Sequence, residues 1–548
     1  MYSRIGVKNI HSLFIALIFL FGIFSTVILH LFLKSPSLYF LDSIYYIRLA
    51  EKIQTGHWFI ENRYGNFQTF APFYPILISL LERIIHNFEN AGIYISIIAG
   101  SFATTIAILL ARIFYKTNMG WLWLVLVFFM FNPFYVLYSS AVLTEALFTF
   151  LFLTAICVIY LALSKNSLLM WFSAGIIGGM AWLTRDVGVI VPITASIWII
   201  IGLIKNKNSI IKFICFGALF TMGILMVYLP IKILVHFDSS GVTRLQPKST
   251  IIYNILAPNT KELLMSELYL RKLTPEGEYA FIPVMKKMKW MRLFTDWKWI
   301  VERFIINVFG VGRSMALIFF VIFFPFIFVG IYALKNSEKK LAGQPFIWPQ
   351  KRYLFLLSFV FLYILFYAVA GGFTGPLSPE RYLVPIIPIL GIWCVAGLLS
   401  TGEKISKMFG KKIGALFVSS FIIFFLMVSA LSIVFISKTH IPFYQNKTDL
   451  MGLAMLGIFE RHPNQDQLII MSRRTFLSYF TNSLPILTPY GEYDEIIKFA
   501  KSKKVDFFFL ENSLYAPQLE FLKNTKISTP ELKFILQIEQ GNLYQLIY

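Results

Sequence analysis

Long apolar runs separated by short polar breaks dominate the first 436 residues of the chain. A helix that crosses a bilayer needs about 20 mostly apolar residues, and eleven runs come close to or exceed this length. The pattern therefore predicts an all-α polytopic membrane domain with about eleven transmembrane helices. The predicted spans are 11–33, 91–111, 121–138, 142–163, 168–184, 187–204, 211–235, 314–334, 353–370, 383–400 and 414–436.

The first long loop, residues 34–90, contains two segments with a different pattern. In LDSIYYIRLAEKIQTG (41–56) and PILISLLERIIHNF (75–88), apolar residues recur three or four positions apart. This spacing puts them on one face of a helix. Short helices with one apolar face are typical of the membrane interface, and we expect both segments to lie there.

After residue 436 the long apolar runs stop, and short strand-like and helix-like segments predict a small C-terminal α/β domain. The chain is thus divided into a transmembrane domain, 1–436, with long loops at 34–90 and 236–313, and a polar domain, 437–548. The elements expected in the polar domain are strand 467–472, helix 474–480, strand 484–489, helix 492–504, strand 505–512, and a hairpin of 532–539 and 543–548 with its turn at 540–542.

Composition excludes a disordered chain and an ordinary soluble enzyme. Of the 548 residues, 57% are hydrophobic and only 14% are charged, whereas soluble proteins are about 25% charged. The net charge of +21 is compatible with either nucleic acid or a membrane surface as a partner. Because most basic residues lie in short breaks between apolar runs, we interpret them as topology signals and expect the lipid bilayer, not nucleic acid, as the partner.

The basic residues are divided unevenly between alternate breaks. One set of breaks holds seventeen Lys and Arg, and the alternate short breaks hold two, Arg185 and Arg381. Loops rich in Lys and Arg stay in the cytoplasm. This bias predicts a cytoplasmic N-terminus, and it places both long loops and the C-terminal domain outside the cytoplasm.

Four ionisable residues lie at the predicted outer ends of the spans: Asp42, Glu145, Arg185 and Arg381. Charged groups at membrane depth are costly and are therefore functional candidates. The set suits transfer from a phosphate-linked donor. A carboxylate can take the proton of an acceptor hydroxyl, and guanidinium groups can neutralise a phosphate leaving group. The alternative interpretation is that these residues anchor the chain in the headgroup layer or form local ion pairs, Arg185 with Asp186 and Glu380 with Arg381.

The order of several motifs resembles the GT-C glycosyltransferases, which use polyprenyl-phosphate sugars. The similarity is greatest to the protein O-mannosyltransferase and lipid A aminoarabinose transferase groups. The motifs that carry it are LDSIYYIRLAEKIQTGHW, FAPFYPILISLLERI, SSAVLTEALFTFLFL, GGMAWLTRDVGVIVP and ERYLVPIIPILGIW, followed by LIIMSRRTFLSYFTNSLPILTP through KKVDFFFLEN. Together they cover most of the chain outside 236–313.

The resemblance implies a role for each of the four residues. Asp42 corresponds to the catalytic base, Glu145 to a second acid of the active site, and Arg185 to a residue on the carrier phosphate. Arg381 is assigned to the same phosphate. The chain departs from the family pattern in that Ser43 follows Asp42, where members often have a second acid, and in that Glu145 stands where many have Asp. The resemblance also implies a plasma (inner) membrane location.

Cofactor and partner expectations follow from the same residues. The seven histidines show no metal-ligand spacing, so no metal site is assigned, although Asp42, Glu145 and a lipid phosphate could together hold a divalent cation. We expect a polyprenyl-phosphate-linked sugar as donor and a glycan, lipid or protein as acceptor. The sugar and the choice between dolichyl and undecaprenyl carriers stay open. The alternatives are a transporter or flippase of lipid-linked sugars, an O-antigen polymerase or ligase, and a receptor or scaffold.

Overall fold

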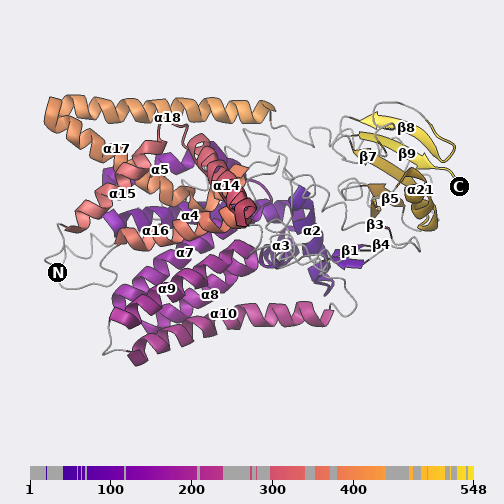
Figure 1. Ribbon diagram of the computed structural model, residues 1–548, viewed down its shortest axis with the longest axis horizontal. Coiled ribbons are helices and arrows are strands. Elements are labelled where there is room, and N and C mark those ends of the chain that lie inside the picture. Colours follow the sequence, from indigo (N-terminus) through magenta and orange to yellow (C-terminus); the bar gives the residue numbers. More distant parts are fainter. Residues whose placement is uncertain are drawn as a thin grey trace. The chain divides into compact units, whose positions relative to one another are not determined.

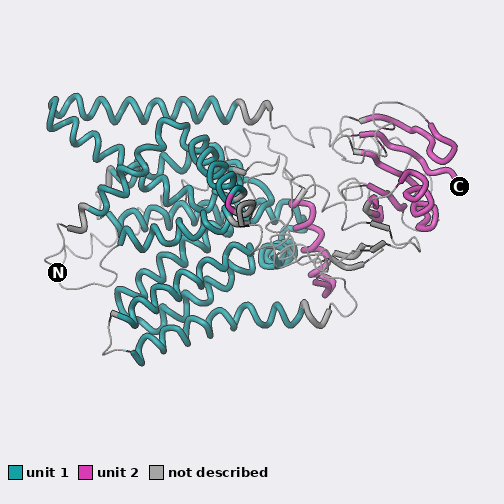
Figure 2. Tube along the Cα trace, in the orientation of Figure 1, with its two compact units in different colours: residues 1–37, 70–237, 302–440 teal, residues 38–69, 238–301, 441–548 magenta. Residues whose placement is uncertain are grey.

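A computed structural model gives the fold of the chain (Figure 1). Contacts divide the chain into two compact units, shown in Figure 2: residues 1–37, 70–237 and 302–440, and residues 38–69, 238–301 and 441–548. The described residues are 20, 27, 41–58, 60–62, 65–67, 71–115, 119–205, 210–238, 272–273, 279–280, 297–339, 352–370, 379–439, 468–472, 483–489, 492–511, 519, 522, 528–538 and 541–548.

The first unit is built from helices. In chain order they are α3 (Phe73–Ile85), α4 (Phe88–Tyr115), α5 (Met119–Met130), α6 (Pro133–Ser139), α7 (Thr144–Lys165), α8 (Leu168–Thr184), the 3-10 helix η1 (Asp186–Val189), α9 (Ile190–Lys205), α10 (Ile210–Asp238), α14 (Trp297–Ile318), α15 (Phe324–Lys339), α16 (Arg352–Ala370), the 3-10 helix η4 (Pro379–Ile386), α17 (Ile387–Phe409) and α18 (Lys411–Thr439). Among the described residues, six segments are long and apolar enough to cross a bilayer. The chain is an integral membrane protein.

Most predicted spans correspond to helices of this unit. The six long segments fall on α4, α7, η1 with α9, α10, η4 with α17, and α18. The predicted span 121–138 is a helix pair, α5 and α6, bent by 64°, and α8 and α16 are shorter apolar helices. The first predicted span, 11–33, lies outside the described residues apart from Leu20 and Val27.

The prediction of one continuous span at 314–334 is wrong. The helix α14 ends at Ile318 and α15 begins only at Phe324. Between them, Phe320 and Val321 have φ angles of 50° and 58°, a left-handed conformation that ends a right-handed helix. The side-chain amide of Asn132 donates to the Ile318 carbonyl oxygen at 3.2 Å. This bond satisfies one of the carbonyl groups that a helix end leaves without an internal partner.

The bend between α5 and α6 also has a local cause. Asn132 caps α6, because its side-chain oxygen accepts from the backbone N–H of Tyr135 at 3.1 Å. Pro133 occupies the first helical position, where a missing N–H costs least. A new helix therefore starts at this point instead of continuing α5.

Burial distinguishes the central helices of the first unit from the peripheral ones. In the most apolar windows, 89% of the η4–α17 segment and 78% of α7 is buried, against 28% of α10 and 17% of α18. Close packing around α17 depends on glycine, because a Cβ atom at Gly330 of α15 would overlap with the Trp393 carbonyl oxygen of α17. Charged groups are therefore most costly in α7 and in the η4–α17 segment.

The helices α7 and α8 run in opposite directions, which brings the end of α8 back to the start of α7. Glu145 lies in the first turn of α7, and Lys165 lies in its last turn. The chain returns through α8 and reaches Arg185. At the end opposite Glu145, Arg352 at the start of α16 donates to the Ile113 carbonyl oxygen near the end of α4, at 3.2 Å.

The two predicted amphipathic segments are helical. One is α3, which packs against α4 and α8 and buries Tyr74 and Ile78, whereas Leu80 and Ile84 are exposed. The other is α2 (Leu41–Gln54), which belongs to the second unit and buries Ile44 and Ile47. Their location at the membrane interface stays a prediction.

The second unit contains a five-stranded sheet in its C-terminal part, and its order is β6-β5-β7-β9-β8. The strands are β5 (Ile469–Ser472), β6 (Leu484–Leu487), β7 (Phe507–Glu511), β8 (Leu532–Ile538) and β9 (Gly541–Leu546), with α21 (Tyr493–Ser502) between β6 and β7. The first three strands are parallel, and β9 pairs antiparallel with β7 and β8. Two further antiparallel pairs are β1 (Ile60–Asn62) with β2 (Gly65–Phe67), and β3 (Lys272–Leu273) with β4 (Tyr279–Ala280).

The C-terminal sheet confirms the predicted small α/β region, with one correction. The sequence predicts Gly541 and Asn542 as turn residues, but they pair with Ile538 and Gln537 inside the hairpin. Pairing extends to Gly541 because the buried Asn542 side chain donates to the Leu522 carbonyl oxygen at 2.9 Å, which holds this end of β9 in the domain. The predicted helix 474–480 lies outside the described residues.

Candidate functional site

The site is centred on Glu145, in the first turn of α7. Its side chain is fully buried, at the end of the helix where the backbone dipole favours a negative charge. The Thr149 hydroxyl donates to the Glu145 carbonyl oxygen at 2.7 Å, and the Thr144 hydroxyl lies 3.5 Å from carboxylate oxygen Oε2. The two threonines therefore hold the backbone and the side chain of this turn.

Arg185 reaches Glu145 from the short connection between α8 and η1. Its backbone is extended, and its N–H donates to the Ala181 carbonyl oxygen at 3.1 Å, which closes α8. The guanidinium Nη1 lies 2.6 Å from Glu145 Oε1 and 3.3 Å from the Thr144 hydroxyl oxygen. The helix α8 runs antiparallel to α7, so Arg185, which directly follows α8, lies beside the first turn of α7.

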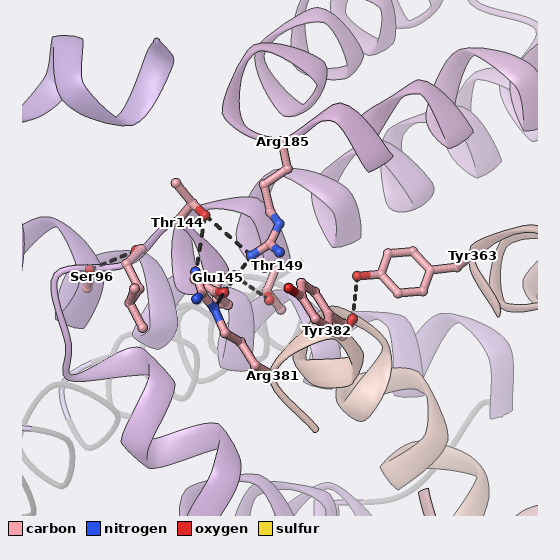
Figure 3. A network of polar contacts seen from close by, with 9 residues as sticks. Ser96, Thr144, Glu145, Thr149, Arg185, Tyr363, Arg381 and Tyr382 are labelled. Carbon is pink, nitrogen blue, oxygen red and sulfur yellow. Dashed lines mark hydrogen bonds and ion pairs between the residues drawn. The ribbon is translucent and has the colours of Figure 1, made fainter. Parts of the chain in front are cut away.

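Arg381 reaches the same carboxylate from η4. Its Nε–H donates to Glu145 Oε1, the oxygen that also contacts Arg185 (Figure 3). The side chains of Arg185 and Arg381 are 12% and 11% exposed, and that of Glu145 is 0% exposed. One carboxylate with two guanidinium groups has a net charge of +1, and the exposed part of this cluster belongs to the arginines. The arrangement can bind an anion.

Three tyrosines that contact one another lie beside the charged cluster. The ring of Tyr382, the residue after Arg381, lies 5.9 Å from the Arg185 guanidinium carbon, within cation–π distance. The Tyr367 ring lies 5.2 Å from the Tyr382 ring and also 5.2 Å from the Tyr363 ring. The Tyr363 hydroxyl donates to the Tyr382 carbonyl oxygen at 2.7 Å (Figure 3). The Tyr382 ring therefore limits the ways in which the Arg185 guanidinium can turn.

Three of the four residues singled out from the sequence thus meet in the first unit: Glu145, Arg185 and Arg381. The fourth, Asp42, lies in the first turn of α2, in the second unit, and its part in the site stays a prediction. The sequence interpretation of Arg185–Asp186 and Glu380–Arg381 as local pairs does not account for the arginines, because both contact Glu145.

A divalent cation does not fit Glu145 well. Its Oε1 atom already contacts two guanidinium groups, and these would repel a cation. In the parts of the chain that the structure describes, no three His, Cys, Asp or Glu side chains are grouped as metal ligands. We therefore assign no mechanistic step to a metal.

Sequence reasoning missed the residues that support the charged cluster. These residues are the uncharged Thr144, Thr149, Tyr363, Tyr367 and Tyr382, of which the first four lie inside predicted apolar spans and Tyr382 lies just before one. A signal was present, because Tyr363 and Tyr367 are four residues apart in one apolar run, and Tyr382 follows Arg381 directly. Two phenols on one face of a buried helix need hydrogen-bond partners.

Comparisons with known proteins agree with this architecture. Residues 70–233, which include Glu145 and Arg185, match the family described as dolichyl-phosphate-mannose-protein mannosyltransferase. Among curated proteins, none matches the chain.

Two solved structures share the fold over most of the chain. ArnT from Cupriavidus metallidurans, bound to undecaprenyl phosphate, has a TM-score of 0.57 and 10% identity, over 98% of this chain and 98% of that one. The archaeal oligosaccharyltransferase AglB from Archaeoglobus fulgidus, in complex with an inhibitory peptide and a dolichol-phosphate, has a TM-score of 0.53 and 13% identity, over 91% of this chain and 70% of that one. The fold that the resemblance implied is thus confirmed, because the chain shares the fold of ArnT and AglB.

Proposed function

We propose that this protein is a membrane glycosyltransferase that moves a sugar from a polyprenyl-phosphate carrier to an acceptor hydroxyl at the outer membrane face. One observation carries the proposal: Arg185 and Arg381, from distant parts of the chain, meet on the buried carboxylate of Glu145. The cluster keeps one unneutralised positive charge, and its exposed part is arginine. In a GT-C fold, such a cluster suits the phosphate of a lipid-linked sugar.

The arginines act on the leaving group. When the bond between the sugar's anomeric carbon and the phosphate oxygen breaks, negative charge grows on the phosphate. Fixed guanidinium groups stabilise this charge more in the transition state than in the ground state, which lowers the barrier. Arg185 and Arg381 are held before the donor binds, so little rearrangement is needed as the charge develops.

Glu145 prepares both arginines for this task. Without a carboxylate between them, two buried guanidinium groups would repel each other. Glu145 thus fixes their spacing, which agrees with its assignment to the active site but makes orientation of the arginines its main role. The proposal includes a second role for Glu145, which is to orient the acceptor, the sugar or Asp42.

Asp42 serves as the general base. It takes the proton from the acceptor hydroxyl, and the freed oxygen attacks the anomeric carbon. The carbon–phosphate oxygen bond breaks, and polyprenyl phosphate leaves with the bonding electrons. A carboxylate in this role contributes about 100-fold or more to the rate.

We propose a plasma (inner) membrane location. Asp42, the long loops and the C-terminal domain then lie outside the cytoplasm, and the N-terminus lies inside.

The carrier and acceptor are defined by chemistry. The two similar solved proteins hold undecaprenyl phosphate and a dolichol-phosphate, so both lipids are candidate carriers here. The acceptor is a hydroxyl group on a glycan, a lipid or a protein.

The deciding experiment offers purified protein a panel of undecaprenyl- and dolichyl-phosphate sugars, together with glycan, lipid and peptide hydroxyl acceptors, and measures release of the free carrier phosphate. We expect at least one donor to be consumed, and we expect the Arg185→Ala, Arg381→Ala double variant to consume it far more slowly. A proteoliposome assay for movement of the same lipids tests the transporter alternative. Flipping without any release of carrier phosphate would overturn the proposal.

A further inference from the structure

The segment that carries Arg381 depends on contacts from outside itself. It forms η4, a 3-10 helix of eight residues, although runs beyond three or four residues are uncommon because the hydrogen-bond geometry is poor. Two residues of other helices donate hydrogen bonds to it, at the positions directly before and after Arg381. The Ser314 hydroxyl donates to Glu380 Oε1 at 3.4 Å, and the Tyr363 hydroxyl donates to the Tyr382 carbonyl oxygen at 2.7 Å. The second bond holds the main chain itself.

Tyr363 also contacts the helix that carries Glu145. Its ring centre lies 6.4 Å from that of Phe148 and 5.6 Å from that of Phe152. Both phenylalanines belong to α7, three and seven residues after Glu145, and thus lie close to its helix face. The ring of Tyr363 therefore packs on α7 while its hydroxyl group binds η4. One buried side chain connects the two elements whose charged residues meet.

The aromatic contacts extend this connection to Arg185. Tyr367, one turn after Tyr363 on α16, has its ring 5.2 Å from that of Tyr382, which in turn faces the Arg185 guanidinium at 5.9 Å. A shift of η4 along the bundle would therefore move Arg381 away from Glu145 and Tyr382 away from Arg185 together.

We propose that Tyr363 is a positioning residue, which sets the separation between η4 and α7 so that Arg381 and Arg185 converge on Glu145 in the geometry that binds a phosphate group. The proposal rests on the proposed function for its consequence, which is carrier-phosphate binding, but the positioning itself can be measured without any carrier. Tyr363 acts through the segment that carries Arg381, because its hydroxyl group binds the Tyr382 carbonyl oxygen.

The test compares Tyr363→Phe with Tyr135→Phe. Tyr135 is a matched control because its buried hydroxyl likewise donates to a backbone carbonyl oxygen, that of Gly100, at 2.8 Å. Both substitutions remove one buried hydroxyl group and leave the ring in place. Each variant is checked for a single folded species before use. Backbone hydrogen exchange over 379–386 is then measured, together with the dissociation constant for undecaprenyl phosphate.

We expect Tyr363→Phe to speed exchange over 379–386 by about tenfold, the effect of one lost hydrogen bond, and to weaken undecaprenyl phosphate binding by a similar factor. Tyr135→Phe should change neither quantity. In an Arg381→Ala background, Tyr363→Phe should weaken binding no further, because residues that act through one group are not additive.

The outcomes separate the positioning role from the proposed function. Unchanged exchange over 379–386 in Tyr363→Phe overturns the positioning role, whatever the binding data show. Equal effects of the two tyrosine variants overturn it as well, since they indicate a general loss of stability. If exchange rises as expected but Arg381→Ala leaves undecaprenyl phosphate binding unchanged, the carrier-phosphate function fails and the positioning of η4 stands.

Discussion

Arg381 donates its Nε–H to Oε1 of Glu145 across 236 residues of chain. The bond joins the 3-10 helix before α17 to the first turn of α7, and both helices are largely buried. Because Arg185 contacts the same oxygen atom, the position of each arginine depends on a single carboxylate. The removal of that carboxylate is therefore the most direct test of the site.

Glu145→Gln keeps the size of the side chain and removes its charge. Two nearly buried guanidinium groups are then left without a counter-charge, and breaking a buried ion pair from one side costs about 3–5 kcal/mol. We expect a clearly lower melting temperature in detergent and a loss of at least about tenfold in carrier affinity. Glu403→Gln is the control, because Glu403 is an exposed acid on α17. Similar melting temperatures for both variants would argue against the charge cluster as a structural centre.

Substitutions of the arginines separate phosphate binding from anchoring in the headgroup layer. Arg185→Lys keeps the charge but loses the planar fork, so transfer should be impaired and not abolished. Arg185→Ala and Arg381→Ala should each weaken free carrier binding by about 10- to 100-fold, and the double change should be less than additive. Specific activity per folded molecule is measured alongside affinity.

Arg352→Ala provides the control for the arginine series, because Arg352 lies at the opposite end of the bundle and contacts a backbone carbonyl oxygen. We expect it to lower yield without changing carrier affinity. If the Arg185 and Arg381 variants behave in the same way, with normal specific activity and reduced yield, both residues are anchors and not phosphate ligands.

Asp42→Asn tests the general base. The amide has the same shape but cannot take a proton at this point of the reaction, and we expect turnover to fall by at least about 100-fold. Binding of free carrier should be retained, because the arginines hold the phosphate. Asp494→Asn serves as a control at another acidic first-turn residue, in α21. Near-normal turnover in Asp42→Asn would remove this residue from the mechanism.

Helix packing makes a separate prediction about stability. Gly330→Ala places a methyl group against the Trp393 carbonyl oxygen, at the contact between α15 and α17. The two helices must move apart, and overpacking of this kind costs about 1–3 kcal/mol. Gly312→Ala is the control, because nothing lies within 4 Å of the added atom. The melting temperature of the first variant should fall and that of the second should not. An unaltered Gly330→Ala protein would contradict the close approach of these helices.

Topology is tested with tags. The division of seventeen basic residues against two between alternate breaks predicts that the C-terminus lies outside the cytoplasm. A tag after Tyr548 should be accessible to protease or label in intact cells, and a tag within the predicted cytoplasmic loop 335–352 should not. Release of the C-terminal domain by protease added only to the cytoplasmic side would reverse the assigned orientation.

The sequence by itself determined the apolar spans, because a segment that crosses lipid must satisfy its backbone hydrogen bonds internally and expose apolar side chains. A single run of about 20 residues can meet both requirements by its own composition, and 91–111 within α4 is such a run. For the same reason the sequence pointed to Glu145, Arg185 and Arg381 as costly charges. It failed at 314–334, where hydropathy is continuous but the backbone at Phe320 and Val321 leaves the helical conformation.

Only the tertiary structure decided which residues the charged side chains contact. Their sequence neighbours offered local pairs, Arg185 with Asp186 and Glu380 with Arg381, and local spacing favours such pairs. In the fold, antiparallel α7 and α8 bring Arg185 to Glu145, and η4 brings Arg381 to the same atom. The positioning role proposed for Tyr363 could not be predicted from the sequence for a related reason. A hydroxyl group that binds a carbonyl oxygen 19 residues away leaves no periodic pattern, because the contact is made by the packing of helices and not by the helix itself.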